Sequence, residues 1–283
     1  MLKSGYKQSH GDHTLFIKHS QDGKVTVLLV YVDDIIITGD NEIEMERLKE
    51  CLTKEFDIKE LGRLKYFLEI EVAHSQQRIF ISQQNYVIDL LKETGKLGCK
   101  PAVVSVDPNQ KLGESPEDLA VDREMYQRLV GKLIYLSHTR PDIAYAVSMV
   151  SQFMHSPREV HLQAAYQILH YLKGSPSRGV LFKRNSSLVL EAYTNADYAE
   201  SVVNRRSTSG YCTFIGGNLI ILDDLKIKRS GPMRLYCDNK SAISIAHNPV
   251  QHDRTKHIEV DKNFIKENLN SLYSLCLDYR TIG

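Results

Sequence analysis

The strongest hydrophobic pattern in the chain is a pair of β-branched apolar runs that flank two adjacent carboxylates. The runs cover residues 27–32 and 35–38, and Asp33 and Asp34 stand between them. Short apolar runs predict buried strands, and the short link predicts a hairpin, although it lacks the Asn-Gly pair that favours the tightest turns. Two neighbouring carboxylates at such a tip repel each other, and a hard divalent cation, usually Mg²⁺, relieves the repulsion. The alternative is a solvated turn that happens to hold two Asp residues.

The rest of the chain alternates between helical and strand-like patterns. Apolar residues at helical spacing predict amphipathic helices at 41–56 and 83–95, and two strands are predicted within 61–82. Residues 102–119 are polar and rich in Pro and Gly, which is typical of a linker. Residues 120–174 predict three helices, and Pro141 suits the first position of the second of them. Strand patterns return from Val180, so the predicted fold class is α+β.

Composition narrows the class of protein. Of the 283 residues, 42% are hydrophobic and 25% are charged, which is ordinary for a globular protein. The formal net charge is +1, so binding to nucleic acid would need local basic patches. The five Cys are widely spaced without a CxxC motif, which argues against a disulfide framework and a zinc site. With no signal peptide or membrane-spanning run, we expect an intracellular protein, in either cytoplasm or nucleus, without a membrane partner.

Several strings resemble one known family. Residues 31–34, Tyr-Val-Asp-Asp, resemble the metal-binding tip of reverse transcriptases, and residues 126–131 and 139–144 are similar to strings of the copia-type retrotransposon branch. This resemblance implies an antiparallel palm followed by a helical thumb and connection region. It also implies two Mg²⁺ ions for nucleotidyl transfer, held by Asp33 and Asp34 with a third Asp on an earlier strand. No upstream residue matches that third Asp, and Asp12 is the nearest carboxylate. Glu69 stands where the family usually has Gly, which indicates relaxed constraint there.

The last hundred residues resemble the ribonuclease H domain that follows the polymerase in copia-type elements. In that family four carboxylates hold two metal ions. The first position is Asn195 here, the third is Asp238, and the fourth is either Glu259 or Asp261. The helix that carries the second carboxylate is expected to be missing, because residues 216–220 run almost directly into 223–228. The resemblance therefore predicts a partial α/β domain with an incomplete metal site.

Together these patterns predict three segments. Residues 1–113 are expected to form the later part of the palm and the start of the thumb, 114–185 the helical thumb and connection region, and 186–283 a degenerate ribonuclease H-like domain. We expect residues 120–174 to be the most self-contained part. The resemblance implies an RNA template and an RNA–DNA hybrid as partners and Mg²⁺ as cofactor. The candidate residues fall into three groups: catalytic Asp33, Asp34, Asp238 and Asp261; metal-binding Asp33, Asp34, Asp238 and Glu259; and nucleic-acid-binding Arg140, Arg205, Arg206, Lys240 and Lys256.

Three functional hypotheses follow. The first is a working reverse transcriptase–ribonuclease H, which would need a partner chain to complete its sites. The second, which we favour, is a fragment of such an enzyme without catalytic activity. The third is a non-catalytic nucleic-acid-binding remnant or adopted host protein, for which a steep salt dependence of hybrid binding would be the sign.

Overall fold

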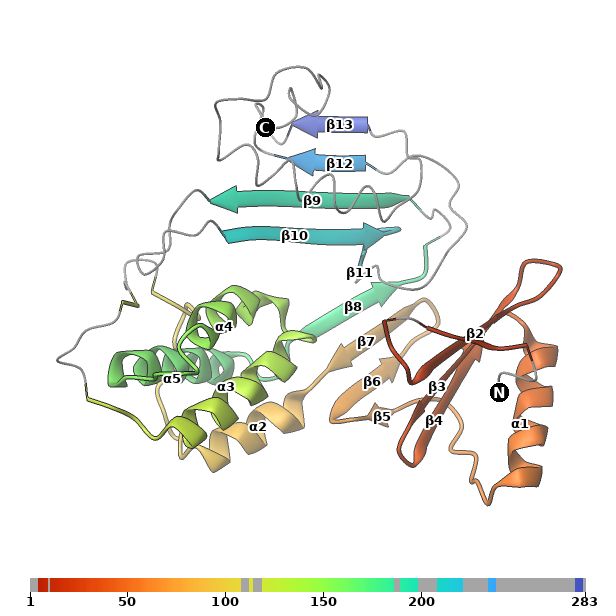
Figure 1. Cartoon of the computed structure of the whole chain (residues 1–283), viewed down its shortest axis with the longest axis horizontal. Coiled ribbons are helices and arrows are strands. Elements are labelled where there is room, and N and C mark those ends of the chain that lie inside the picture. The colour runs from red at the N-terminus through yellow and green to blue at the C-terminus, as the bar shows by residue number, and fades with distance from the viewer. Residues whose placement is uncertain are drawn as a thin grey trace. The chain divides into compact units, whose positions relative to one another are not determined.

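The computed structural model describes residues 5–9, 11–107, 112–113, 119–185, 189–197, 208–220, 234–237 and 278–281. Its packing divides the chain into two compact units. The first is 1–68 with 221–227, and the second is 69–220 with 228–283. Both hold strands and the second is rich in helices, so the predicted α+β class is confirmed (Figure 1).

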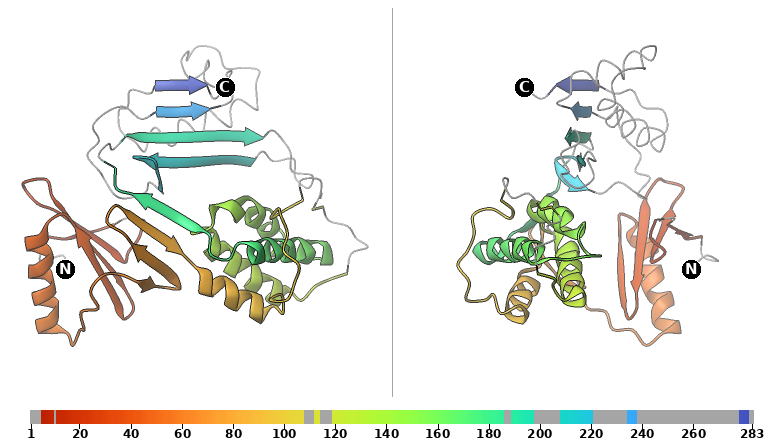
Figure 2. Two further views of the ribbon diagram at one scale, coloured as in Figure 1. Left: turned by 180° about the vertical axis from the view of Figure 1, so that it is seen from behind. Right: turned by 60° about the vertical axis from the view of Figure 1, so that its left-hand side comes forward.

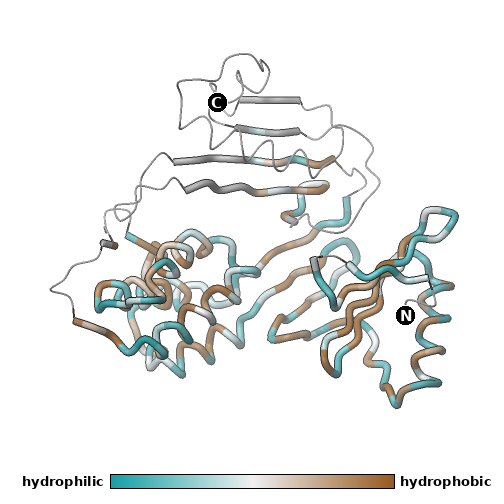
Figure 3. The backbone as a smooth tube through the Cα atoms, viewed as in Figure 1, coloured by the Kyte–Doolittle hydropathy of each residue, from teal (hydrophilic) through white to brown (hydrophobic). Residues whose placement is uncertain are grey.

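The first unit is an antiparallel sheet with one helix packed on it. Its strands pair in the order β1 (Lys7–Gln8), β2 (Leu15–His19), β3 (Val25–Tyr31) and β4 (Asp34–Gly39). The following helix α1 (Glu42–Glu55) lies within the predicted range 41–56, and its N-cap Asn41 accepts a hydrogen bond from the Glu44 N–H. Leu28 of β3 packs with Leu48 and Leu52 of α1, and Figure 3 shows the apolar character of the hairpin strands. The short strand β5 (Tyr66–Phe67) is the edge strand of a second four-stranded sheet.

A cluster of charged and polar side chains connects α1 to β2 and to the segment before β1. Glu44 accepts hydrogen bonds from Lys18 Nζ at 2.9 Å, from Arg47 Nη2 at 2.9 Å and from the Tyr6 hydroxyl at 3.2 Å. The hydrogen bonds from Arg47 and Lys18 lower the pKa of Glu44 from 4.5 to about 2. Burial and the neighbouring Glu44 raise the pKa of Tyr6 to about 12. The cluster therefore joins the segment before β1, strand β2 and helix α1.

The second unit has a helical core. It is built from α2 (Gln84–Glu93), α3 (Arg123–Ser137), the 3₁₀ turn η2 (Pro141–Ile143), α4 (Ala144–Ser151) and α5 (Glu159–Gly174). Pro141 opens η2 at its first position, as predicted. Val87, Leu90 and Leu91 of α2 are buried in the same core as α3 and α5, and the compact unit that holds them starts at residue 69. Leu112, inside the predicted linker, is also buried there.

Two sheets complete the second unit. One has the order β5-β6-β7-β8, in which β6 (Ile70–His74), β7 (Arg78–Ser82) and β8 (Gly179–Lys183) pair antiparallel. Strand β8 thus returns from the far end of α5 to join a hairpin a hundred residues earlier. The other sheet is mixed and has the order β11-β10-β9-β12-β13 (Figure 2). Its strands are β9 (Leu190–Asp197), β10 (Thr208–Ile215), β11 (Asn218–Ile220), β12 (Arg234–Cys237) and β13 (Asp278–Thr281). Among the described residues, no helix is both long and apolar enough to cross a bilayer.

The link between β5 and β6 has an unusual backbone. Leu68 has φ +47 and Glu69 has φ +63, so both central residues of this two-residue turn are left-handed. Such a turn is normally made by Asn and Gly, because a Cβ is strained in that conformation. Glu69 thus occupies a position whose backbone still has the geometry of the Gly that the family usually places there.

Candidate functional site

The two adjacent carboxylates lie at the end of a tight hairpin. Strands β3 and β4 pair antiparallel from Thr26–Gly39 up to Tyr31–Asp34, so only Val32 and Asp33 form the turn (Figure 1). The predicted hairpin is therefore confirmed, with Asp33 in the turn and Asp34 at the first position of β4. Both residues are exposed to solvent. Tyr31 is 43% exposed and packs edge-on against the ring of Phe67, with ring centroids 6.4 Å apart.

The turn carries backbone strain. Val32 has φ +50 and its side chain is 83% exposed. A β-branched residue in the left-handed region is a true outlier, and such strain costs about 1–3 kcal/mol. The surrounding pairing must impose this conformation, since a Gly or Asn would adopt it more easily. Strain of this kind gathers at functional sites, so the outlier marks the tip as a candidate site independently of its carboxylates.

The carboxylates of Asp33 and Asp34 are available to bind a ligand. Within the part of the chain that the structure describes, neither makes a side-chain hydrogen bond or an ion pair, and no three His, Cys, Asp or Glu side chains gather to hold a metal ion. Mg²⁺ typically binds one or two carboxylates and completes its shell with water or substrate phosphate. The donor set at this tip therefore fits one weakly held Mg²⁺. It does not fit a two-metal centre, which needs more carboxylate ligands.

Asp12 lies at the same end of the sheet as the Asp pair. The Val30 N–H donates to the carbonyl of Thr14 at 2.9 Å, which brings the loop before β2 beside the end of β3. The Asp12 carboxylate accepts hydrogen bonds from the Thr14 N–H at 2.8 Å and the Thr14 hydroxyl at 2.6 Å. These bonds engage Asp12 in a local turn. It therefore does not replace the third carboxylate that the resemblance implies.

The second predicted site is described only through its strands. Strands β9 and β12 are adjacent and parallel, and Cys237 pairs with Thr194. Asn195 directly follows Thr194 in the chain, and Asp238 directly follows Cys237. The register is described up to Thr194 and Cys237, the residues that precede the first and third mapped positions. Asp238 itself lies outside the described residues, as do Glu259, Asp261, Arg205, Arg206, Lys240 and Lys256.

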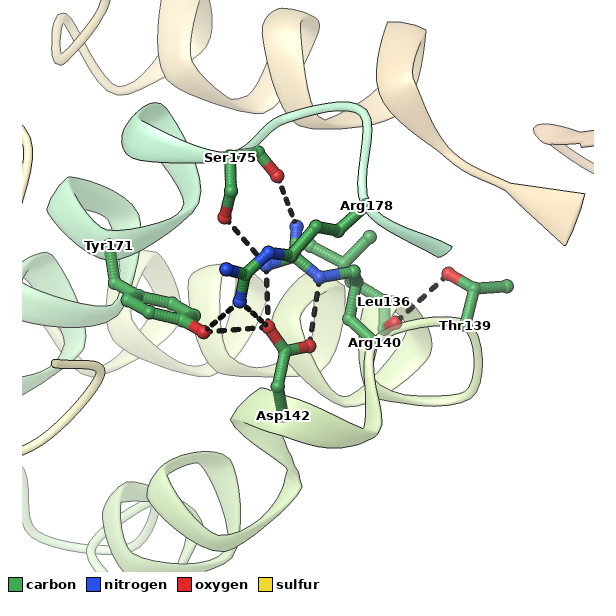
Figure 4. A network of polar contacts seen from close by, with 7 residues as sticks. All are labelled: Leu136, Thr139, Arg140, Asp142, Tyr171, Ser175 and Arg178. Atoms are coloured by element: carbon green, nitrogen blue, oxygen red, sulfur yellow. Dashed lines mark hydrogen bonds and ion pairs between the residues drawn. The ribbon is translucent and has the colours of Figure 1, made fainter. Parts of the chain in front are cut away.

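Arg140 lies in the interior and not on a surface. It is 1% exposed, and its Nε and Nη2 donate to Asp142 Oδ1 and Oδ2 at 2.9 and 2.8 Å (Figure 4). Its remaining bonds go to the carbonyl and hydroxyl of Ser175, at 2.9 and 3.1 Å. Four hydrogen bonds therefore hold the guanidinium in the interior, and its role in nucleic-acid binding stays a prediction. Arg140 instead joins the end of α3 to the end of α5.

Asp142 is the centre of this network. It also accepts a hydrogen bond from the Tyr171 hydroxyl at 2.8 Å, and Arg178 Nη1 lies 3.6 Å from its Oδ2. Burial alone would raise the pKa of Asp142, but the hydrogen bonds from Arg140 and Tyr171 outweigh it and hold that pKa below its ordinary value. Asp142 is therefore a carboxylate with a structural role, and the network explains why the Arg-Pro-Asp string sits where two helices meet.

Comparison with known proteins gives the family. Residues 1–108 match the family model described as reverse transcriptase (RNA-dependent DNA polymerase). The chain is 35% identical to the retrovirus-related Pol polyprotein from transposon RE1 of Arabidopsis thaliana, over 96% of this chain and 21% of the polyprotein. It is 38% identical to an uncharacterized mitochondrial protein of the same plant, over 68% of this chain and 80% of that protein. It is 30% identical to a putative transposon Ty5-1 protein of Saccharomyces cerevisiae, over 81% of this chain and 74% of that protein.

These matches cover the chain better than they cover the polyproteins. The chain spans about a fifth of the length of the RE1 polyprotein. No solved structure matches it. The hairpin tip of residues 31–34 falls inside the reverse transcriptase match, and the polyprotein match extends over nearly all remaining residues. The chain therefore belongs to the copia-type retrotransposon Pol family and carries a reverse transcriptase-like domain in its first 108 residues.

Proposed function

We propose that this chain is a reverse transcriptase–ribonuclease H segment of a copia-type Pol polyprotein that does not by itself catalyse DNA synthesis. The observation that carries the proposal is the hairpin tip. Its turn brings together two free carboxylates, and within the described residues no third ligand joins them. In nucleotidyl transfer by a two-metal centre, the metal ions bind both the attacking and the leaving oxygen. Two carboxylates that bind a single ion with low affinity would leave one of these two oxygens without a metal ion.

Primer extension tests this proposal. The full chain, the Asp33→Asn variant and a charge-matched Asp22→Asn control are assayed on a primed RNA template with Mg²⁺ or Mn²⁺. Asp22 lies in the exposed turn between β2 and β3, away from the hairpin tip, so its loss leaves the candidate site intact. We expect no extension by any of the three proteins once circular dichroism has shown each to be folded. Extension by the chain and the control that Asp33→Asn abolishes would refute the proposal, because the tip would then be catalytic.

We also propose that the second half of the chain does not cleave RNA. The first mapped carboxylate position is Asn195, which can offer a carbonyl oxygen but no charge. The match with the RE1 polyprotein runs over 306 aligned positions, which exceeds the 283 residues of this chain. The polyprotein thus has residues inside the matched stretch that this chain lacks, which supports the expected loss of a helix. Two of the four carboxylates would then be absent.

The change Asn195→Asp tests the mapping. It would restore the carboxylate at the first mapped position of the ligand set that also includes Asp238. We expect Mn²⁺ affinity, measured by calorimetry, to rise in this variant and to fall back when Asp238→Asn is added. Cleavage of an RNA–DNA hybrid should remain absent in all variants. Cleavage by the unaltered chain would overturn the proposed inactivity, and an unchanged Mn²⁺ affinity would overturn the mapping.

A second candidate function is a non-catalytic nucleic-acid-binding remnant. One observation favours it: Arg78 and Lys183 lie opposite each other on β7 and β8, both are exposed, and neither forms an ion pair with a residue that the structure describes. Binding of this kind would not require either metal site.

A further inference from the structure

Helix α5 begins with a cap in which a buried histidine supplies the hydrogen-bond acceptor. The N-cap residue is Arg158, and its backbone N–H donates to His161 Nδ1 at 3.1 Å. His161 is fully buried and lies three residues after the N-cap, at the position where a capping box usually has Glu or Gln. Its ring stacks on the ring of Phe153, with centroids 3.8 Å apart and planes 15° apart. The imidazole therefore connects the start of α5 to the turn that precedes it.

This cap determines the protonation state of His161. A backbone N–H can only donate, so Nδ1 accepts and the single proton of the neutral ring is on Nε2. An imidazolium carries a proton on both nitrogens, so its Nδ1–H would point at the Arg158 N–H and the cap bond would be lost. The first turn of a helix also has the positive end of the helix dipole, which disfavours a cation. The folded start of α5 therefore requires a neutral imidazole.

Three carboxylates belong to the segments that meet at the start of α5. Glu159 accepts a hydrogen bond from Gln163 Nε2 at 2.6 Å, while Asp122 and Glu124 are exposed, so that solvent screens their charge. The other charged or titratable groups of these segments are Arg123, Tyr126 and Arg128 of α3, Tyr145 of α4, and His155 and Arg158 before α5. The face of Phe153 would attract an imidazolium weakly, which does not offset the cost of burying a charge. Protonation therefore destabilises this part of the fold.

We propose that His161 is an acid-sensitive switch, whose protonation opens the start of α5. The Glu159 N–H donates to the Leu119 carbonyl at 3.0 Å, and Arg158 forms a β-bridge with Ala120, so opening would also release residues 119–120 from the helix. A solvated imidazole takes up a proton near about pH 6.5. In acid the open state thus binds one more proton than the closed state. The closed state is fully stabilised above about pH 6.5 and loses stability as the pH falls below it.

Hydrogen–deuterium exchange of the full chain at pH 7 and pH 5, measured by mass spectrometry, tests the proposal. Uptake of one proton on opening should raise the opening equilibrium constant about twentyfold over this range. After correction for the chemical exchange rate, we expect the protection of the amides of residues 158–162 to fall by about that factor in the unaltered chain. His161→Gln keeps the acceptor that a capping box needs but does not titrate, so its protection should be the same at both pH values.

His138→Gln is the matched control. His138 is exposed, and its Nδ1 lies 3.0 Å from the Tyr135 carbonyl oxygen, so this nitrogen donates and the bond survives protonation. This variant should keep the full acid response of the unaltered chain. Equal protection of residues 158–162 at both pH values in the unaltered chain, or the same acid response in His161→Gln, would overturn the proposal.

Imidazole ¹⁵N NMR of the unaltered chain gives a second measurement that does not require the His161→Gln variant to fold. The His161 signals, assigned through contacts with the Phe153 ring, should show the neutral ring with its proton on Nε2 at pH 7. An imidazolium at pH 5 in a chain whose α5 amides stay protected would overturn the proposal. None of these measurements involves nucleic acid or catalysis, so the proposed function is judged separately.

Discussion

The change Asp142→Asn should destabilise the second unit, because it removes the carboxylate that pairs with the buried guanidinium of Arg140. Arg140 is 1% exposed, and two of its four side-chain hydrogen bonds go to Asp142. Breaking a buried pair costs about 3–5 kcal/mol, and bonds to a charged group contribute about 1.5–3 kcal/mol each. Asp142 keeps 29% of its side chain exposed, and Arg140 keeps both bonds to Ser175, so the cost lies toward the lower values. We expect a loss of about 2–3 kcal/mol.

Thermal unfolding followed by far-UV circular dichroism measures this loss. For a unit of this size, about 2–3 kcal/mol corresponds to a melting temperature lower by roughly 5–10 °C. Tyr171→Phe is the matched control, because it removes one hydrogen bond to the same carboxylate and keeps the charge pair. It should cost about 1 kcal/mol. A loss below about 0.5 kcal/mol for Asp142→Asn would refute the reasoning, since a surface substitution has an effect of that size.

The pair of Arg140 and Asp142 should also make the stability of the fold depend on pH in a defined direction. The pKa of Asp142 lies below the ordinary value of 3.8, so its contribution to stability is present above that pH and is lost as the pH falls below it. The difference between the unaltered chain and Asp142→Asn should therefore shrink in acid. Arg140→Lys adds a further test. Lysine keeps the charge but cannot form the paired bonds, so we expect lower stability. A normal melting temperature with weaker nucleic-acid binding would instead support Arg140 as a binding residue.

Three further changes test the first unit and its boundary. Glu69→Gly should raise stability by about 1 kcal/mol in urea unfolding, because Gly adopts φ +63 without strain, and a loss would contradict the turn geometry. Gly39→Ala should cost about 2 kcal/mol or more, because its Cβ would lie 2.1 Å from the Val25 carbonyl oxygen; limited proteolysis that shows no faster cleavage would refute this. Glu44→Gln should remove the loss of stability seen as the pH falls from 4.5 toward 2, because Glu44 stabilises the fold only while it is charged. An unchanged acid titration would rule out that role.

Local sequence patterns predicted the helices well, because their apolar spacing and caps are encoded within each segment. Helix α1 within the predicted range 41–56 and Pro141 at the start of η2 are examples. The packing partners of helix α2 were harder to predict. Helix α2 belongs with α3 and α5 because Val87, Leu90 and Leu91 fill their core, and no feature of α2 alone reveals that partner. The polar composition of residues 102–119 likewise suggested a free linker, although Leu112 is buried.

Candidate residues divide in the same way. Asp33 and Asp34 could be named as candidates from the sequence, because two adjacent carboxylates between apolar runs form a local signal. The burial of Arg140 could not be predicted, because its partners Asp142 and Ser175 can be assigned only once α5 is placed. The pairing of Arg78 with Lys183 was missed, since these residues meet through a strand pairing between distant segments. Only an expectation that β8 joins the β6–β7 hairpin could have brought them together.

The hairpin tip shows why geometry alone does not establish activity. The strain at Val32 is set by the strands on either side, which pair without interruption from Thr26–Gly39 to Tyr31–Asp34. That pairing depends on buried residues such as Leu28, which packs against α1 and does not depend on any metal ion. The tip therefore keeps its shape whether or not a second metal can bind. A preserved turn is evidence of ancestry, while activity requires the further carboxylate that the described residues do not bring to it. Primer extension, rather than the conformation of the turn, distinguishes the two.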